Sequence, residues 1–300
     1  MKSNDLFLIA SISKTITVTA LLQLYDKGLF KLDDLINDYL PFKISNPNQI
    51  QDITFKMLLT HTSSIADGNA LDSQYYYGKD SPIPLIEFLK DYFIPLGKYY
   101  NADQNFYNFK LGSQHEYSNI GNAPIGYLVE VISDQNSNIY CKEHIFKPLG
   151  MKNSFWRLDE IKQHIVVPYS YSRKVYKPIQ HYTFTDYPNG GLRSTAKDLH
   201  LFLKTISNNG QLDSFELLKP ETVEKMISPQ IPNIDNEVGL HLFLMNQSHN
   251  LWGRDGGEEG ASTIMAFNPG TKIGVIILSN QGDADLGNLL SEAYMYGLNK

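Results

Sequence analysis

The stretch LFLIASISKTITVTALLQLYDKGLF, residues 6–30, decides how the rest of the chain is interpreted. Its positions 12–28 are apolar nearly all round a helical period, which predicts a buried central helix. Ser11 and Lys14 stand where this helix begins, in the tetrad Ser-Ile-Ser-Lys. Residues at this spacing share one face of a helix, so the lysine is placed to act as a base for a serine nucleophile.

The predicted helix gives this pair two properties that catalysis needs. A hydroxyl at a helix N-terminus lies at the positive end of the helix dipole, which favours a developing negative charge. The stripe that continues from Lys14 is apolar, with Val18, Leu22 and Tyr25. We therefore expect Lys14 to lie in a dry environment, and desolvation lowers the pKa of a lysine and makes it a plausible base.

A second Ser-x-x-Lys occurs later in the chain, from Ser194 to Lys197. Thr195 and Asp198 there form a capping-box pattern, which predicts the start of an amphipathic surface helix. Lys197 would then be solvated and keep its proton. Helix setting therefore favours Ser11 over Ser194 as the nucleophile.

Composition excludes several classes of protein. The chain has 300 residues, a hydrophobic share of 42% and a single cysteine, Cys141, so it can build a core without disulfides or a Cys-rich metal site. Its net charge of −6 argues against nucleic acid or an anionic membrane as the main partner. No apolar run is long enough to span a bilayer, and the first residues do not form a signal peptide.

The pattern of the remaining elements predicts an α/β sandwich and not a βαβ repeat, because a helical middle is followed by an antiparallel sheet and a closing helix. Helices are expected at 54–64, 82–97, 121–134, 136–150, 194–210, 219–229 and 284–299, and strands at 237–246, 261–269 and 272–280. An NPGT turn joins the last two strands. The Tyr-rich segment 73–116 is expected to form long polar-aromatic loops.

Several blocks, in this order, resemble the serine β-lactamase-like and penicillin-binding protein family. They are LFLIASISKTITVTALLQLYDKGLFKLDDLINDYLP, ITFKMLLTHTSSI, YSNIGNAPIGYLVEVIS, IFKPLGMKNSFW, YPNGGLRSTAKDLHLFL and GRDGGEEGASTIMAFNPGTKIGVIILSN. The family contains class C β-lactamases, D-alanyl-D-alanine carboxypeptidases, D-aminopeptidases and related esterases. The resemblance runs from about residue 5 to the C-terminus.

The resemblance implies a β-lactamase/transpeptidase-like α/β fold, with an antiparallel sheet flanked by helices and an all-helical subdomain. We expect one domain over residues 1–300. Its helical subdomain would cover about 40–210, and its sheet subdomain about 1–39 plus 211–300. Family members usually carry a helix and a β-hairpin before the first motif, and these are missing here. The missing hairpin predicts an exposed sheet edge, with marginal stability or pairing of that edge with another chain.

The resemblance also implies the roles of the catalytic residues. Ser11 and Lys14 carry the first motif. The second, Tyr-x-Asn, has three candidates, at Tyr99, Tyr117 and Tyr187. Only Tyr117 leads, through Asn119, directly into a helix of the expected pattern. Tyr117 would relay the proton between Ser11 and the leaving group, and Asn119 would hydrogen-bond the substrate.

The third family motif, Lys-Thr-Gly or His-x-Gly, is replaced here by Arg254, Asp255 and Gly256. Arg254 can bind a carboxylate with two hydrogen bonds, but it cannot act as an acid or base near neutral pH. Asp255 is expected to pair with Arg254 and weaken anion binding. The literal Lys-Ile-Gly at Lys272 follows the hairpin turn and is interpreted as structural.

The resemblance implies acyl transfer, with the oxyanion between the backbone N–H groups of Ser11 and Gly257. Gly256 and Gly257 allow the backbone to approach the substrate closely. The substrate would be an ester, a D-amino-acid peptide or a lactam, a small molecule or peptide. The alternative is a non-catalytic or truncated family member that binds a peptidoglycan-like ligand or a protein partner.

Other catalytic signatures are absent from the sequence. There is no Gly-x-Ser-x-Gly elbow, no His-Glu-x-x-His, no Cys-x-x-Cys and no phosphate loop, so we expect neither a metal nor a cofactor. His61 is interpreted as a structural histidine. The family resemblance suggests a periplasmic or secreted protein, although no signal peptide is recognised in this chain.

Overall fold

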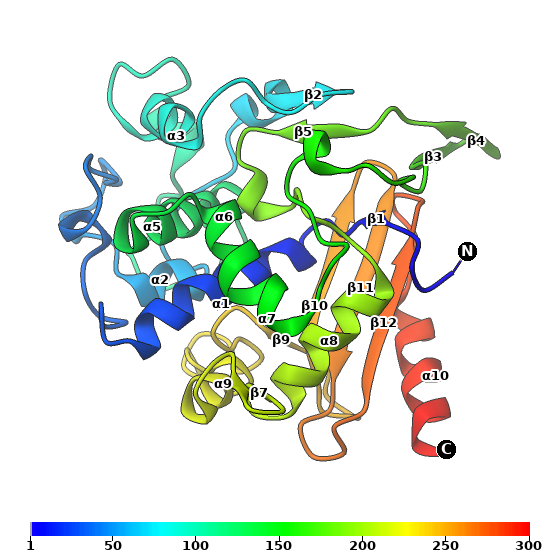
Figure 1. The fold of residues 1–300 in the computed structure, drawn as a ribbon. Coiled ribbons are helices and arrows are strands. Elements are labelled where there is room, and N and C mark those ends of the chain that lie inside the picture. Colours follow the sequence, from blue (N-terminus) through cyan, green and yellow to red (C-terminus); the bar gives the residue numbers. More distant parts are fainter. Residues whose placement is uncertain (1) are drawn as a thin grey trace.

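The computed structural model describes residues 2–300 and contains a four-stranded antiparallel sheet at one side of the molecule (Figure 1). The strand order is β12-β11-β10-β9. The bounds are β9 (Phe243–Asn246), β10 (Leu251–Glu258), β11 (Ala261–Phe267) and β12 (Gly274–Ser279). The two strands predicted at 261–269 and 272–280 are confirmed and pair with each other, whereas the strand predicted at 237–246 forms only over its last four residues.

The central helix α1 (Ile12–Asp26) is confirmed, two residues shorter than the predicted 12–28. It packs against β10 and β11 on one side and against α5 and α6 on the other. A helix buried on all sides needs apolar residues all round, which is the pattern that its sequence carries. Gly28, at φ +74, provides the left-handed backbone conformation that ends helices.

The other predicted helices form within the predicted ranges, but the helix predicted at 54–64 already ends at Leu59, and α4 lies in the Tyr-rich segment where loops were expected. The predicted helix at 136–150 is interrupted by a π-helical turn, Lys142–Phe146. Only the N-cap half of the capping box predicted before α8 forms: Thr195 Oγ1 accepts a hydrogen bond of 3.1 Å from Asp198 N, whereas the Asp198 carboxylate accepts from Asn153 N and Ser154 Oγ. The bounds are α2 (Phe55–Leu59), α3 (Leu85–Phe93), α4 (Ala102–Asn105), α5 (Ala123–Ser133), α6 (Ser137–Cys141), α7 (Lys147–Leu149), α8 (Ala196–Ser207), α9 (Pro220–Met226) and α10 (Gly287–Leu298).

The sequence patterns did not predict four two-stranded pairs, because each strand is only two to four residues long; two of these pairs join distant segments and two are local hairpins. Part of the Tyr-rich segment, expected to be loops, forms β2 and pairs with β5 over the face of the molecule that carries the site. The pairs are β1 (Phe7–Leu8) with β6 (Arg193–Ser194), β2 (Tyr75–Tyr77) with β5 (Tyr182–Phe184), β3 (Tyr169–Ser172) with β4 (Val175–Pro178), and β7 (Gln211–Leu212) with β8 (Phe215–Glu216).

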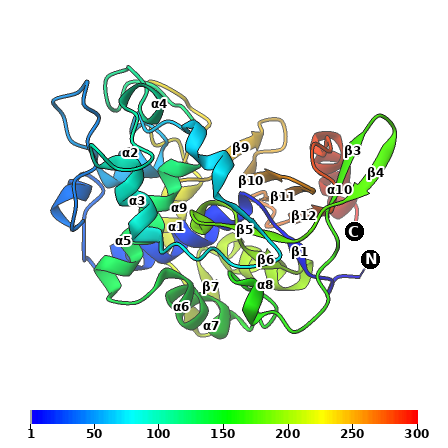
Figure 2. The same ribbon diagram turned by 90° about the horizontal axis from the view of Figure 1, so that it is seen from above.

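Two helices cover opposite faces of the sheet. Ile264 and Ala266 of β11 pack with α10, whereas the alternate residues Met265 and Phe267 belong to the main core with α8. This alternation is the period of two expected of a strand buried on both faces. Figure 2 shows the sheet and α10 on one side and α2 to α5 on the other, with α1 between them.

β12 forms one edge of the sheet, since within residues 2–300 it pairs with β11 alone. Within the same residues, no helix has the length and apolar character needed to cross a membrane.

Candidate active site

Ser11 and Lys14 meet at the N-terminus of α1 as the tetrad predicts. Lys14 Nζ donates a hydrogen bond of 2.8 Å to Ser11 Oγ. Ala10, just before them, has φ +48, an uncommon conformation for a residue with a side chain, and it turns the chain sharply from β1 into the helix. Such strain at a nucleophile is a recurrent feature of functional sites.

Lys14 is completely buried, as the apolar stripe predicts. Burial lowers the pKa of its ammonium, and the positive charge of Arg254 lowers it further. Besides Ser11, the ammonium donates to Asn119 Oδ1 at 2.8 Å and to the backbone oxygen of Asn189 at 2.6 Å. Asn189 belongs to the short helix η6 (Tyr187–Asn189), and the sequence analysis did not assign it a role.

Tyr117 is the one tyrosine of the three Tyr-x-Asn candidates that contacts the nucleophile. Its hydroxyl lies 3.1 Å from Ser11 Oγ and donates to Asn119 Oδ1 at 3.2 Å. Burial of the hydroxyl raises the pKa of Tyr117, but the positive charges of Lys14 and Arg254 outweigh it and lower the pKa to about 8. Part of the ring remains open to solvent.

The other candidate motifs have structural roles. Tyr187 pairs its hydroxyl with Ser137 Oγ at 2.7 Å. Ser194 is buried with its Oγ 2.8 Å from that of Ser154, and Lys197 is exposed, so the second Ser-x-x-Lys forms no reactive pair. Lys272 lies in the turn before β12 and donates to Asn208 Oδ1 at 3.0 Å.

Asp67 holds the Tyr117–Asn119 segment in place, and the sequence analysis missed it. One carboxylate oxygen accepts hydrogen bonds from Ser118 Oγ and Ile120 N, and the other accepts from Asn119 N and Asn119 Nδ2, at 2.8–3.0 Å. Asn119 therefore has both ends of its amide engaged, with Lys14 and with Asp67. Only the sequence SSIADG after the short helix α2 marks this position, and no spacing relates it to Tyr117.

Arg254 lies on β10 directly behind Tyr117. It is 1% exposed and donates to His241 O at 3.0 Å. Its guanidinium carbon lies 5.1 Å from the centre of the Tyr117 ring. The expected pairing with Asp255 is wrong: the two residues form no ion pair, and Asp255 is exposed while Arg254 is buried, because successive side chains of a strand point to opposite faces.

Gly256 brings β10 against the start of α1. A Cβ atom on Gly256 would lie 2.8 Å from both Ser11 N and Ile9 O, so only glycine fits there. A Cβ atom on Gly257 would meet nothing within 4 Å. The backbone N–H of Ser11 donates no hydrogen bond within residues 2–300. The pairing of β9 with β10 ends at Gly253, so the edge of β10 beyond Gly253 is not paired with β9.

His61 packs beneath the site, where the structural role expected for it is supported. Its ring centre lies 4.8 Å from that of Tyr117 and 5.4 Å from that of His241, and its Nδ1 accepts a long bond of 3.4 Å from Ser118 N. Burial, and then the charge of Arg254, lowers the pKa of both histidines well below the usual value. His61 therefore packs against Tyr117 as a neutral ring, and His241 packs against His61.

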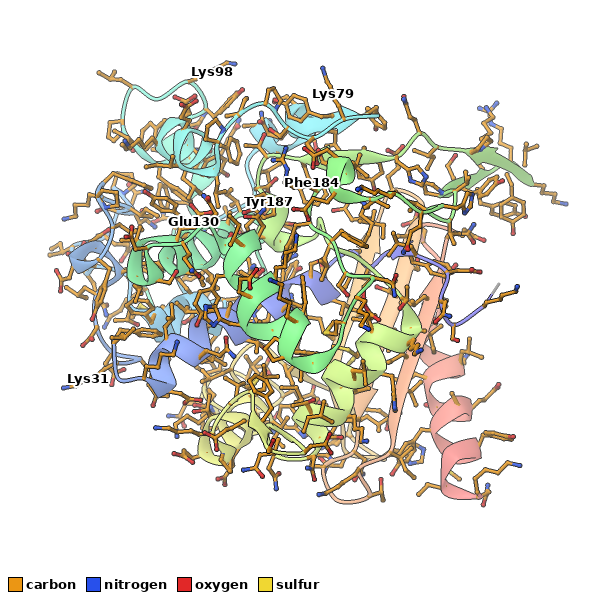
Figure 3. The ribbon with its side chains drawn as sticks, viewed as in Figure 1. Lys31, Lys79, Lys98, Glu130, Phe184 and Tyr187 are labelled. Carbon is orange, nitrogen blue, oxygen red and sulfur yellow. The ribbon has the colours of Figure 1, made fainter. Side chains whose placement is uncertain are left out.

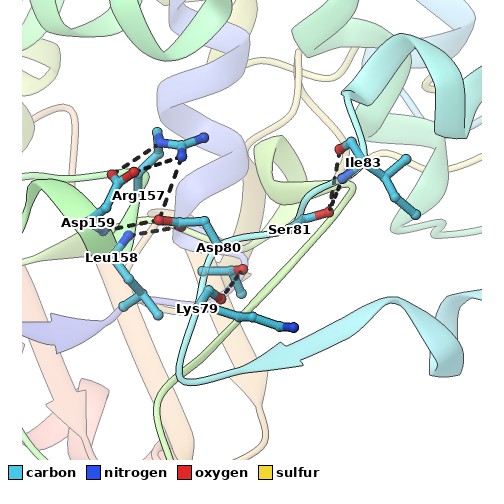
Figure 4. Close-up of polar contacts among 8 residues, drawn as sticks. Lys79, Asp80, Ser81, Ile83, Arg157, Leu158 and Asp159 are labelled. Carbon is cyan, nitrogen blue, oxygen red and sulfur yellow. Dashed lines mark hydrogen bonds and ion pairs between the residues drawn. The ribbon is translucent and has the colours of Figure 1, made fainter.

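A groove lies apart from Ser11, Lys14 and Tyr117, none of which lines it. It measures about 670 Å³ and is lined by Glu130, Phe184 and Tyr187, which Figure 3 labels. At its rim Asp80 accepts hydrogen bonds from Leu158 N and Asp159 N (Figure 4). None of the reactive side chains lines it, so its size does not make it the catalytic centre.

No group of three or more His, Cys, Asp or Glu side chains suited to a metal ion occurs within residues 2–300. The chemistry available at the site is that of the hydroxyl, the ammonium, the phenol and the backbone amides around Ser11.

Comparison with known proteins places this chain in a family. The Beta-lactamase family matches residues 1–292. "Beta-lactamase-like protein 2" of Dictyostelium discoideum is 28% identical over 284 residues, which cover 90% of this chain and 48% of that protein. The chain thus spans about half the length of this curated relative.

Two solved structures show the same fold over the whole chain. The octameric penicillin-binding protein homologue from Pyrococcus abyssi superposes with a TM-score of 0.79 at 23% identity, covering 100% of this chain and 67% of that one. The D-amino acid amidase from Ochrobactrum anthropi SV3, complexed with L-phenylalanine amide, superposes with a TM-score of 0.78 at 20% identity, covering 100% and 85%. With the family match spanning nearly its entire length, this chain belongs to the beta-lactamase family of serine hydrolases and penicillin-binding proteins.

Proposed function

We propose that this protein is a serine hydrolase that forms an acyl-enzyme through Ser11 on an ester, a D-amino-acid peptide or amide, or a lactam. The observation that carries the proposal is the contact of Ser11 Oγ with both Lys14 Nζ, at 2.8 Å, and the Tyr117 hydroxyl, at 3.1 Å. A hydroxyl becomes a nucleophile when a neighbouring group takes its proton, and both neighbours have a lowered pKa.

In this mechanism Ser11 Oγ attacks the carbonyl carbon of the substrate while its proton passes to the pair of Lys14 and Tyr117. The oxyanion accepts hydrogen bonds from the backbone N–H groups of Ser11 and Gly257, each worth about 3 kcal/mol in the transition state. Tyr117 returns the proton to the leaving group as the bond to it breaks. Water then attacks the acyl-Ser11 ester and releases the acid.

Three further residues complete the proposed site. Arg254 contributes positive charge behind Tyr117 and keeps the pKa of that phenol low. Gly256 allows β10 to lie against the first turn of α1, so that a substrate on the open edge of β10 reaches Ser11. Asn119 orients Lys14 on the side where the substrate enters. The similarity to a D-amino acid amidase supports an amide of an amino acid as one substrate.

A non-catalytic protein that binds a peptidoglycan-like ligand or a protein partner is the second candidate. It is favoured by one feature, the non-titrating Arg254 where the family motif has Lys or His. In that case the ordered contacts around Ser11 would bind a ligand without forming a covalent bond.

Covalent labelling distinguishes the two candidates. The protein is incubated with a fluorophosphonate and, separately, with a penicillin, and the adduct is located by peptide mass. The proposal expects an adduct on Ser11 that is absent from Ser11→Ala and retained in the matched control Ser194→Ala, in which the serine of the second Ser-x-x-Lys is replaced. No adduct with either reagent, from folded protein, would exclude the hydrolase; the penicillin result separates a penicillin-recognising site from a general esterase.

The proposal includes self-association through the outer edge of β12, because this strand pairs with β11 alone. Analytical ultracentrifugation of the protein at micromolar concentration tests this, and a monomer at all concentrations would overturn it.

A further inference from the structure

A cavity of about 240 Å³ adjoins the catalytic centre on the side away from β9. Four carboxylates line it: Asp67, Asp72, Asp186 and Glu258. Two aromatic residues, Tyr75 and Phe184, also line the cavity. Phe184 lies on β5, above α1 (Figure 3).

The cavity shares its inner wall with the reactive lysine. Asn119 and Asn189 both line the cavity, and both accept hydrogen bonds from Lys14 Nζ. Glu258 directly follows Gly257, the proposed second donor to the oxyanion. A substrate whose carbonyl oxygen lies at Gly257 is therefore close to this cavity, and the amine site assigned below belongs to the acyl side of that substrate.

The carboxylates of the cavity form no salt bridge, although the charge of Lys14 acts on Asp186 and Glu258. None of the four forms an ion pair with another residue between 2 and 300. Asp186 is 4% exposed; one of its oxygens accepts from Asn189 Nδ2, and the other accepts no hydrogen bond from another residue. Glu258 Oε2 accepts from the Tyr75 hydroxyl at 3.1 Å, and its Oε1 accepts none.

This arrangement is electrostatically unfavourable without a ligand. Burial raises the pKa of Asp186, and repulsion from Glu258 and Asp67 adds to it, so that the pKa reaches about 7. Burial also raises the pKa of Glu258. A cation between these groups would relieve the repulsion and satisfy the free carboxylate oxygens, since charge-assisted hydrogen bonds are the strong ones.

We propose that this cavity binds a protonated amine carried on the acyl side of the substrate, so that the preferred acyl group is an amino-acyl group. The assignment rests on the proposed function, because it takes Ser11 as the point of attack. Asp186 and Glu258 bind the ammonium group, and Tyr75 and Phe184 contact the carbon atoms that connect it to the carbonyl. A ring face also attracts an ammonium group directly.

Binding to the full-length Ser11→Ala protein tests the assignment without turnover. Calorimetry at pH 7 compares phenylalaninamide, as each enantiomer, with 3-phenylpropanamide, which lacks only the amine. We expect the better enantiomer of the amine to bind about tenfold more tightly than the neutral amide. In the double variant Asp186→Asn/Glu258→Gln this ratio should fall to about one. Asp255→Asn, on the exposed face of the same strand, is the matched control and should keep the wild-type ratio.

Equal affinity of the amine and the neutral amide would overturn the amine site, whether or not the double variant folds. An unchanged ratio in a folded double variant would also overturn it. Labelling of Ser11 in the wild-type protein is measured separately: amine selectivity without labelling refutes the hydrolase and retains the amine site, whereas labelling without amine selectivity refutes the amine site alone.

Discussion

Ser11 and Tyr117 are separated by 106 positions in the sequence, yet Ser11 Oγ lies 3.1 Å from the Tyr117 hydroxyl. The ammonium of Lys14 lies 5.3 Å from the centre of the same ring and 2.8 Å from the same Oγ. The Ser11 hydroxyl therefore lies beside the two groups that the proposed mechanism uses as proton acceptors, one from its own helix and one from the loop before α5. That mechanism moves the proton without a titrating residue at position 254.

Removing the Tyr117 hydroxyl should slow acylation. Because its pKa is lowered to about 8, the phenolate fraction of the wild-type protein rises between pH 7 and 9, and the labelling rate by a fluorophosphonate should rise with it. In Tyr117→Phe we expect a rate about 10²–10⁴ lower and no rise near pH 8. Tyr99→Phe, in the Tyr-x-Asn sequence away from Ser11, should behave as wild type. A wild-type pH profile in Tyr117→Phe would remove Tyr117 from the mechanism.

Replacing Gly256 should lower both stability and activity, whereas replacing Gly257 should leave stability unchanged. The new Cβ of Gly256→Ala would lie 2.6 Å from Thr263 Oγ1 and 2.8 Å from Ser11 N, and such overlap costs about 1–3 kcal/mol. Gly257→Ala places its Cβ in open space. Urea unfolding of the two variants measures the difference. Equal unfolding midpoints would show that β10 does not pack tightly on α1.

Neutralising Asp67 should reduce activity by misplacing Asn119 and Tyr117. The carboxylate accepts four hydrogen bonds from residues 118–120, and the amide nitrogen of Asp67→Asn would face donors instead. We expect kcat/KM to fall about 10²-fold, the loss typical of a displaced catalytic group. Asp213→Asn, in an exposed turn, is the control. Because the role is positional, KM should change less than kcat; full activity would refute it.

His241 should make the protein sensitive to mild acid. Its folded-state pKa is far below 6.5, so only the unfolded chain gains a proton as the pH falls below 6.5, and stability is lost there. Between pH 7.0 and 5.5 this loss amounts to about 1.2 kcal/mol. His241→Asn, which tolerates the positive φ at this position, should remove that part of the loss in urea unfolding.

The wild-type pH dependence itself contains an opposite contribution. The pKa of Asp186 is raised to about 7, so its contribution to stability is complete at low pH and is lost as the pH rises through 7. For this reason the readout is the difference between wild type and His241→Asn. The same pH dependence in both proteins would show that His241 titrates normally.

Proton binding at Asp186 should also control the proposed amine site. An alkylamine such as 2-phenylethylamine stays protonated through neutral pH, as lysine does. Its affinity should decrease as the pH falls from 8 to 6, because Asp186 takes up a proton near pH 7 and loses its charge. Calorimetry in two buffers of different ionisation enthalpy should detect proton release on binding at pH 6.5. A constant affinity would show that Asp186 does not bind the amine.

The local features of the site could be predicted from the sequence because they depend on neighbouring residues. The spacing of Ser11 and Lys14 puts them on one helix turn, and the apolar stripe below Lys14 buries it. In the second Ser-x-x-Lys, at Ser194, the N-cap residue Thr195 likewise starts a helix, and Lys197 on that helix is exposed. The division into a helical and a sheet subdomain stays a prediction.

The roles of Asp67, Asn189, Asp186 and Glu258 could not be predicted in this way. Asp67, Asn189 and Glu258 hydrogen-bond to partners far away in the sequence, across gaps that no periodic pattern spans, and Asp186 meets Glu258 at the cavity only through the fold. The expected pair of Arg254 and Asp255 failed for a related reason: neighbours in sequence face opposite sides of a strand, so adjacency does not give contact.

By itself, the sequence determined a buried helix with a serine and a lysine at its start, an antiparallel sheet near its end, and a family to which these blocks are similar. Hydrophobic periodicity and helix spacing depend on residues close together in the sequence, so they can be recognised without the structure. Only the tertiary structure decided which carboxylate holds Asn119, which backbone oxygen accepts from Lys14, and that four acidic side chains line one cavity beside Lys14. These depend on packing between distant segments, where burial and charge are set jointly by residues from several elements.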